Sequence, residues 1–192
     1  MNRLCRRAAL LACALFSGGL VQAQFPDYVE TSRYGYNPMT GTTIQSRGYY
    51  NSFTGAGGGA LSVNTPYTGR AVEGMGVRNP YTGGTRSFKT YYNASTGTRL
   101  EREVVTNPYT GTVRTSGSAY NYFTGRGGNR NVEANPYTGG YRATGTAYDE
   151  FSGGGGFSEQ SYNLYTGTYQ AKRGSYDPFT GTVRRSSFTG QR

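Results

Sequence analysis

Histidine and tryptophan are absent from this chain of 192 residues, and its two cysteines are Cys5 and Cys13. A mature chain without histidine or cysteine excludes Ser-His and Cys-His catalysis and the usual zinc sites. Glu101 and Glu103 lie two apart, which places them on one face of a strand. A glycosidase-like pair could be built from such groups, but we expect them to be solvated charges that balance nearby arginines. The sequence therefore predicts no enzyme, no bound metal and no cofactor.

Aliphatic side chains are scarce. The apolar fraction is 34%, and much of it lies in the first 23 residues, so the rest of the chain does not support a thick hydrophobic core. Glycine and tyrosine are abundant instead, with 31 and 19 residues. We expect order to come from backbone pairing and from tyrosine rings.

The N-terminus has the pattern of a signal peptide. Three arginines precede an apolar stretch from Ala8 to Phe16, which is too short to span a bilayer. Small residues follow up to Ala23, and cleavage is expected before Gln24. Residues 1–23 are therefore predicted to be removed on export, to the periplasm, the cell surface or the extracellular space. The mature chain then has no transmembrane span.

Both cysteines lie within this signal peptide, so the mature chain has no disulfide to stabilise it. In a looser pattern, Cys13 follows a short lipobox and would become a lipidated N-terminus. Removal of Arg3, Arg6 and Arg7 changes the formal net charge from +10 to +7. A basic exported protein indicates anionic neighbours, such as envelope or matrix polysaccharide, or simply a soluble basic surface. An export signal argues against a dedicated nucleic-acid partner.

A repeat of 14 residues fills most of the mature chain. Its fixed position is a glycine, which follows threonine in every copy except after Ser152. The eleven glycines, predicted to have a structural role in turns, are Gly41, Gly55, Gly69, Gly83, Gly97, Gly111, Gly125, Gly139, Gly153, Gly167 and Gly181.

The residues before each glycine predict a hairpin loop. Asparagine or aspartate, often followed by proline, starts a type I turn, and glycine then takes the left-handed conformation that a side chain resists. About nine residues separate successive loops, which is a suitable length for one strand. The array spans 36–181, with an N-terminal segment at 24–35 and a C-terminal segment at 182–192.

Two kinds of 14-residue unit alternate, because some residues recur every 28 positions. An up-and-down antiparallel meander and a β-solenoid with two strands per coil both give this period. The meander is favoured by charge: strands with glutamate alternate with strands that carry only arginine or lysine, so opposite charges meet across neighbouring strands. The residues with the 28-residue period are Tyr92, Tyr120, Tyr148 and Tyr176, and Arg86, Arg114 and Arg142.

The expected fold is all-β, with about twelve short strands. They could form an open twisted sheet, a closed barrel or two packed sheets. Glycine-rich runs at 57–59 and 153–156 weaken strands, so a chain that stays disordered until assembly is an alternative.

Rows of tyrosine and arginine are the candidate binding or self-association residues. The rings of Tyr92, Tyr120, Tyr148 and Tyr176 could stack on sugars or on another copy, with Arg86, Arg114 and Arg142 adding cation–π contacts. These rings could equally pack on one another in place of an aliphatic core.

The run from Tyr36 to Thr42 and its copies resemble the Y-N-P-x-T-G-T units of uncharacterised exported bacterial repeat proteins. This resemblance implies export and repetition, and it carries no activity. The sequence alone thus indicates a non-enzymatic structural or interaction protein of the cell envelope or extracellular matrix. A surface carbohydrate-binding module that uses the tyrosine and arginine rows is the alternative.

Overall fold

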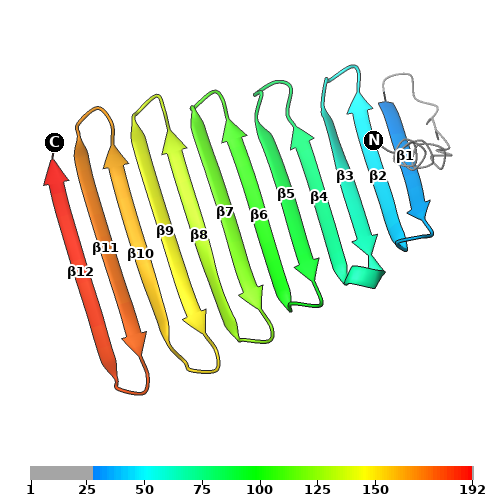
Figure 1. Cartoon of the computed structure of the whole chain (residues 1–192). Helices are drawn as coiled ribbons and strands as arrows, with labels where there is room; N and C mark the ends of the chain where they lie inside the picture. Colours follow the sequence, from blue (N-terminus) through cyan, green and yellow to red (C-terminus); the bar gives the residue numbers. More distant parts are fainter. Residues whose placement is uncertain (1–27, 192) are drawn as a thin grey trace, which may run out of the picture.

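The computed structural model describes residues 28–191, so the predicted signal peptide lies outside the described residues. Within them, twelve strands form one antiparallel sheet in chain order (Figure 1). The strands are β1 (Tyr28–Asn37), β2 (Thr42–Asn51), β3 (Gly57–Thr65), β4 (Arg70–Arg78), β5 (Thr85–Asn93), β6 (Thr98–Asn107), β7 (Thr112–Asn121), β8 (Arg126–Asn135), β9 (Gly140–Asp149), β10 (Gly155–Asn163), β11 (Thr168–Asp177) and β12 (Thr182–Gln191). A 3₁₀ turn, η1 (Pro66–Thr68), joins β3 to β4. No helix in the described part of the chain is long and apolar enough to cross a membrane.

The predicted meander is confirmed. Each strand pairs with the strands before and after it in sequence, as in the β1–β2 register that runs from Tyr28 opposite Asn51 to Asn37 opposite Thr42. The sheet is open, since β1 and β12 lie at its two ends. The solenoid, the closed barrel, the two packed sheets and the unstructured chain are therefore not the fold of the described residues.

Each turn ends on a glycine in the left-handed conformation, as predicted. All eleven repeat glycines have φ between +62° and +69°. The asparagine that starts a turn holds it with its side chain: Asn135 Oδ1 accepts hydrogen bonds from the backbone N–H of Tyr137 at 2.9 Å and of Thr138 at 3.2 Å. This is the Asx turn that asparagine and aspartate favour, and it fixes where each strand stops.

Turns at the same end of the sheet also bind one another. Asn135 Nδ2 donates to the carbonyl oxygen of Thr110, two turns earlier in sequence, at 2.8 Å. Where the second turn residue is not proline, a backbone bond is added, as from Leu164 N–H to the Gly139 oxygen at 2.8 Å. The ladder of backbone hydrogen bonds thus continues past the strand ends into the turns.

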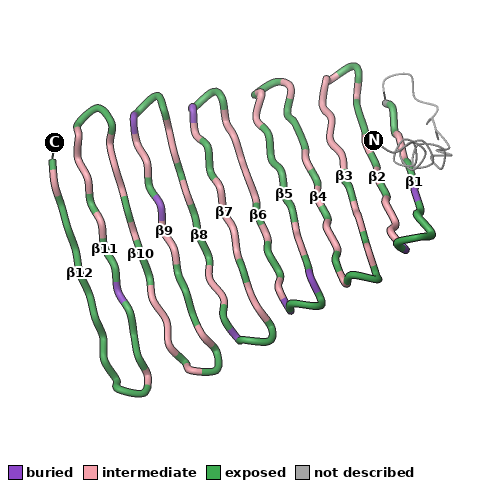
Figure 2. Tube along the Cα trace, viewed as in Figure 1, coloured by how far each residue is buried: buried purple, intermediate pink, exposed green. Residues whose placement is uncertain are grey.

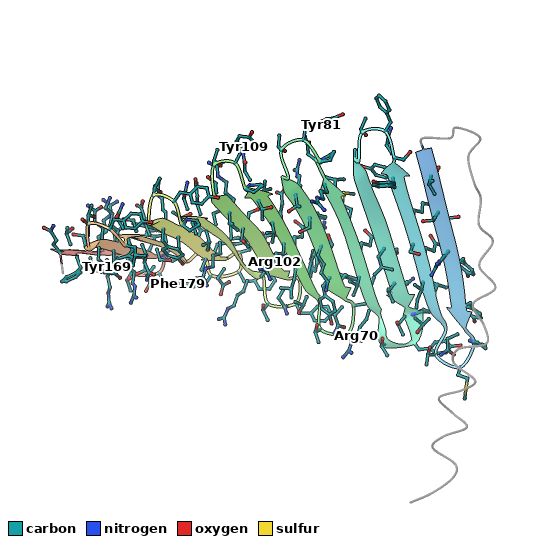
Figure 3. All side chains as sticks on the ribbon, turned by 90° about the horizontal axis from the view of Figure 1, so that it is seen from above. Arg70, Tyr81, Arg102, Tyr109, Tyr169 and Phe179 are labelled. Atoms are coloured by element: carbon teal, nitrogen blue, oxygen red, sulfur yellow. The ribbon has the colours of Figure 1, made fainter. Side chains whose placement is uncertain are left out.

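The sheet has one layer and almost no core. Apart from glycines, the only described residues that are buried are Ala143 and Asn93, which are 8% and 7% exposed. Figure 2 shows exposed and intermediate positions along every strand. Figure 3 shows side chains on both sides of a single ribbon that twists from one end to the other, as β-sheets do. Backbone pairing, rather than apolar burial, is the main source of order.

Candidate functional site

Because side chains alternate along a strand, the sheet has two faces of different chemistry. We call the face with Glu73, Arg86 and Tyr92 the mixed-charge face, and the face with Val72 and Lys89 the cationic face. Each face is reached by solvent, so each is a candidate binding surface.

The four tyrosines with the 28-residue period lie in one row on the mixed-charge face. In the observed register, Tyr120 is opposite Gly127, and Gly127 is opposite Tyr148. The rings of Tyr120 and Tyr148 stack across that glycine, with centroids 6.3 Å apart. A Cβ at Gly127 would lie 2.4 Å from the Tyr148 ring. Glycine is therefore required so that the two rings can meet.

Two further residues extend this tyrosine cluster. Tyr122, in the turn after β7, packs edge-on against Tyr120 with centroids 4.7 Å apart, and also contacts Tyr92 at 6.5 Å. The hydroxyl of Tyr120 donates to Glu150 at 2.6 Å. This hydrogen bond, with a smaller contribution from burial, raises the pKa of Tyr120 to about 12. Hydrogen bonds with Tyr122 and Glu101 raise the pKa of Arg99 in the same row.

The three periodic arginines of the same face are engaged in ion pairs. Each contacts a glutamate on the following strand: Arg86 pairs with Glu103, Arg114 with Glu133 at 3.1 Å and Arg142 with Glu159 at 2.7 Å. The expected meeting of opposite charges across strands is thus present. The structure brings the arginines close to their glutamates and leaves the tyrosines in a separate row, nearer the turns.

The central row of the cationic face carries five basic residues and no acidic residue. It crosses every strand in one continuous register: Arg33, Ser46, Leu61, Gly74, Lys89, Arg102, Gly117, Arg130, Gly145, Ser158, Arg173 and Ser186. We call its basic members, Arg33, Lys89, Arg102, Arg130 and Arg173, the cationic row. All five are exposed, and within residues 28–191 none of them makes an ion pair.

Glycines of this row form the floors of three shallow hollows. The largest, of about 920 Å³, lies over Gly117 between Arg102 and Arg130. A hollow of about 520 Å³ contains Gly145 between Arg130 and Arg173. A third, of about 590 Å³, contains Gly74. The missing side chains thus open space beside the basic residues along the row.

Charge is distributed unequally between the faces. The strands carry seven basic and six acidic residues on the mixed-charge face, against nine basic and two acidic residues on the cationic face. Both acidic residues of the cationic face, Asp149 and Asp177, end their strands and accept hydrogen bonds from their own turns. These bonds, the strongest from the Ser152 backbone, with help from Arg126, lower the pKa of Asp149. The interior of the cationic face has no carboxylate.

Comparisons with protein families, with curated proteins and with solved structures found no match to this chain. Its function has to be argued from these surfaces alone.

The cationic row was not predicted from the sequence. Charges were compared strand by strand there, and a strand such as 98–106 contains both signs. The signal becomes visible only when residues are sorted by face: Glu101 and Glu103 lie on one face of β6, and Arg102 lies on the other. Equal distance from the turn glycines would have aligned Arg102 with Arg130, which are 28 residues apart.

Proposed function

We propose that this chain is a non-enzymatic structural protein of the cell envelope or extracellular matrix, exported by its predicted signal peptide, and that copies join edge to edge into a longer sheet. The observation that carries the proposal is the pair of sheet edges, β1 and β12, each hydrogen-bonded to one strand within the described residues. An edge strand offers a row of backbone donors and acceptors to another chain.

Both edge strands have features that permit pairing. β1 and β12 each contain 10 residues, as long as any strand in the sheet, and pair without a bulge. Neither contains proline. Natural proteins that prevent edge pairing use short strands, bulges, prolines or charges. Of these devices only charge is present, chiefly at Arg184 and Arg185.

The number of strands supports a head-to-tail arrangement. With twelve strands, a second copy placed beyond β12 would present its β1 antiparallel to β12, which continues the meander. One row on the mixed-charge face begins at Ser32 of β1 and ends at Ser187 of β12. Continuing that register places Ser187 opposite Ser32 of the next copy and Arg185 opposite its Tyr34, where a cation–π contact can form.

The turns lead to the same arrangement. Within the sheet, a turn glycine is covered by a residue of the turn two further on, as Gly97 is by the ring of Phe123 and Gly125 by that of Phe151. No atom of the described residues lies within 4 Å of a Cβ built at Gly181, in the last turn. Met39, in the first turn, is 88% exposed, and it would cover Gly181 of the preceding copy.

Site-directed crosslinking tests this arrangement, because the mature chain from Gln24 has no native thiol. We would mix two single-cysteine proteins, S32C and S187C, under mild oxidation. We expect a disulfide between S32C and S187C, identified by mass spectrometry, whose yield rises with protein concentration. S186C is the matched control, since its side chain lies on the other face and should crosslink poorly to S32C.

Two outcomes would overturn the proposal. A mixture that yields mainly S187C–S187C or S32C–S32C pairs would show a symmetric contact that closes after two copies. Light scattering that finds a single copy of the wild-type mature chain at every concentration would show that the edges do not join.

A further inference from the structure

We infer that the cationic face is a binding surface for a linear anionic polysaccharide, which lies across the strands along the cationic row. This surface does not depend on edge association. It rests only on the part of the proposed function that places the protein outside the cell, where such polymers occur.

The first step is that the cationic row is a linear array. Its five basic residues share one register across the sheet, so they lie on a line nearly perpendicular to the strands. Strands are spaced by about 4.8 Å, and Lys89 and Arg102 stand on adjacent strands, while Arg130 is two strands further along. An extended chain of pyranose units advances by nearly one strand spacing per unit. Carboxylates or sulfates along such a chain can therefore reach successive members of the row.

The second step is that the charge of this row is not used within the protein. On the mixed-charge face, glutamates stand beside the arginines and pair with them, as Glu133 does with Arg114. In the cationic row, no acidic residue of the described chain pairs with any member. Like-charged neighbours such as Lys89 and Arg102, which are directly opposite one another, destabilise a sheet. A polyanion would neutralise both residues at once.

The third step concerns the shape of the surface beside the row. The hollows over Gly117 and Gly145 leave space next to Arg102, Arg130 and Arg173. The two rows that flank the cationic row contain small and apolar residues and one further arginine, Arg184, at the far edge. Such rows suit the C–H faces of sugar rings, while the arginines take the anionic substituents.

The same flanking rows favour a polysaccharide over a single-stranded nucleic acid. Nucleic-acid channels of this type combine basic residues with aromatic side chains on which successive bases stack. In the two flanking rows the only aromatic residues are Tyr91 and Phe188, which stand on β5 and β12, seven strands apart. Successive bases would find no continuous stacking surface.

Binding of polygalacturonate, a linear polymer of uronic acid, to the mature chain tests the inference. We would measure affinity by titration calorimetry for the wild type and for R102Q/R130Q. Because each exposed charge contact contributes a modest amount, the loss of two should weaken binding about tenfold. The matched variant is R114Q/R142Q, which removes the same charge at the same spacing from the mixed-charge face and should bind within about twofold of the wild type.

Further comparisons decide between the alternatives. Fully methyl-esterified polygalacturonate, which has no charge, should bind much more weakly, and binding should weaken as salt is added. Equal losses in R102Q/R130Q and R114Q/R142Q would mean that only net charge matters and would overturn the inference. So would tighter binding of a single-stranded oligothymidylate than of polygalacturonate. Circular dichroism would confirm that each variant is folded, and K89Q/R173Q provides a second variant of the row if R102Q/R130Q is not.

Discussion

At the scale of single residues, each repeat glycine answers two constraints that have different origins. Gly111 has φ of +69°, and a Cβ there would lie 2.5 Å from the ring of Tyr137 in the neighbouring turn. The first constraint follows from the turn type and was predictable from the sequence. The second depends on which turns share an edge of the sheet, which the 14-residue period alone does not give.

Substitution of Gly111 and Gly181 by alanine separates these constraints. Both residues have a positive φ, but no described atom lies near the position of a Cβ at Gly181. We expect G181A to lose about 1–2 kcal/mol of unfolding free energy from the left-handed backbone alone. G111A should lose at least about 1 kcal/mol more, because the ring of Tyr137 must move. Urea unfolding at low protein concentration measures both, and equal losses would contradict the contact between turns.

The phenol of Tyr120 provides a second prediction at this scale. Its hydrogen bond to Glu150 requires the proton, so the stabilisation is fully present below the unfolded pKa of about 10. It is lost as the pH rises through the folded pKa of about 12. In E150A, the pKa of Tyr120 should return toward 10, and the folded state should lose this part of its pH dependence between 10 and 12. Ring-labelled NMR titration follows Tyr120 directly; an unchanged pKa in E150A would contradict the contact.

At the scale of the hairpin, the sequence was informative because its signals are local. Asparagine, proline and glycine at fixed offsets determine where each strand stops, and alternation of charge between strands favoured antiparallel neighbours. The limits of β1 and β12 also follow the repeat, even though no complete unit flanks them. Contacts between turns were not foreseen, because they join residues about 25 positions apart, such as Asn135 and Thr110.

Replacement of asparagine by aspartate tests the contact between turns. Aspartate keeps the acceptor that holds the turn, as Asp177 does toward Phe179, but it has no N–H to donate. In N135D the bond to Thr110 is lost, and we expect a loss of about 0.5–1.5 kcal/mol. N107D is the matched control, because Asn107 holds its own turn and no donation from its side chain is found in the described structure. Thermal unfolding that ranks the two variants equally would contradict the role of this bond.

At the scale of the whole molecule, the sequence predicted the meander but not its openness. Local turn signals fix the order of the strands, whereas closure or packing of two sheets depends on how far an apolar face must be buried. Here the apolar residues are spread over both faces, so neither face has enough of them to require a second layer. The same separation into faces explains the candidate sites. The tyrosine row followed from the 28-residue period, but the cationic row required the register across all twelve strands.

A distance measurement across the sheet tests the central claim, an open single layer with strands in sequence order. Spin labels at S32C and S187C stand on one row, on β1 and β12, eleven strand intervals apart. At about 4.8 Å per interval, they should be about 50 Å apart. Labels at S116C and S187C, five intervals apart on the same row, should give about 24 Å. Pulsed electron–electron resonance, with labelled protein diluted into unlabelled copies to suppress contacts between molecules, measures both. Two narrow distributions near these values are the predicted result. A short distance for the first pair, as a closed or folded-over sheet requires, or a broad distribution for both pairs, would contradict it.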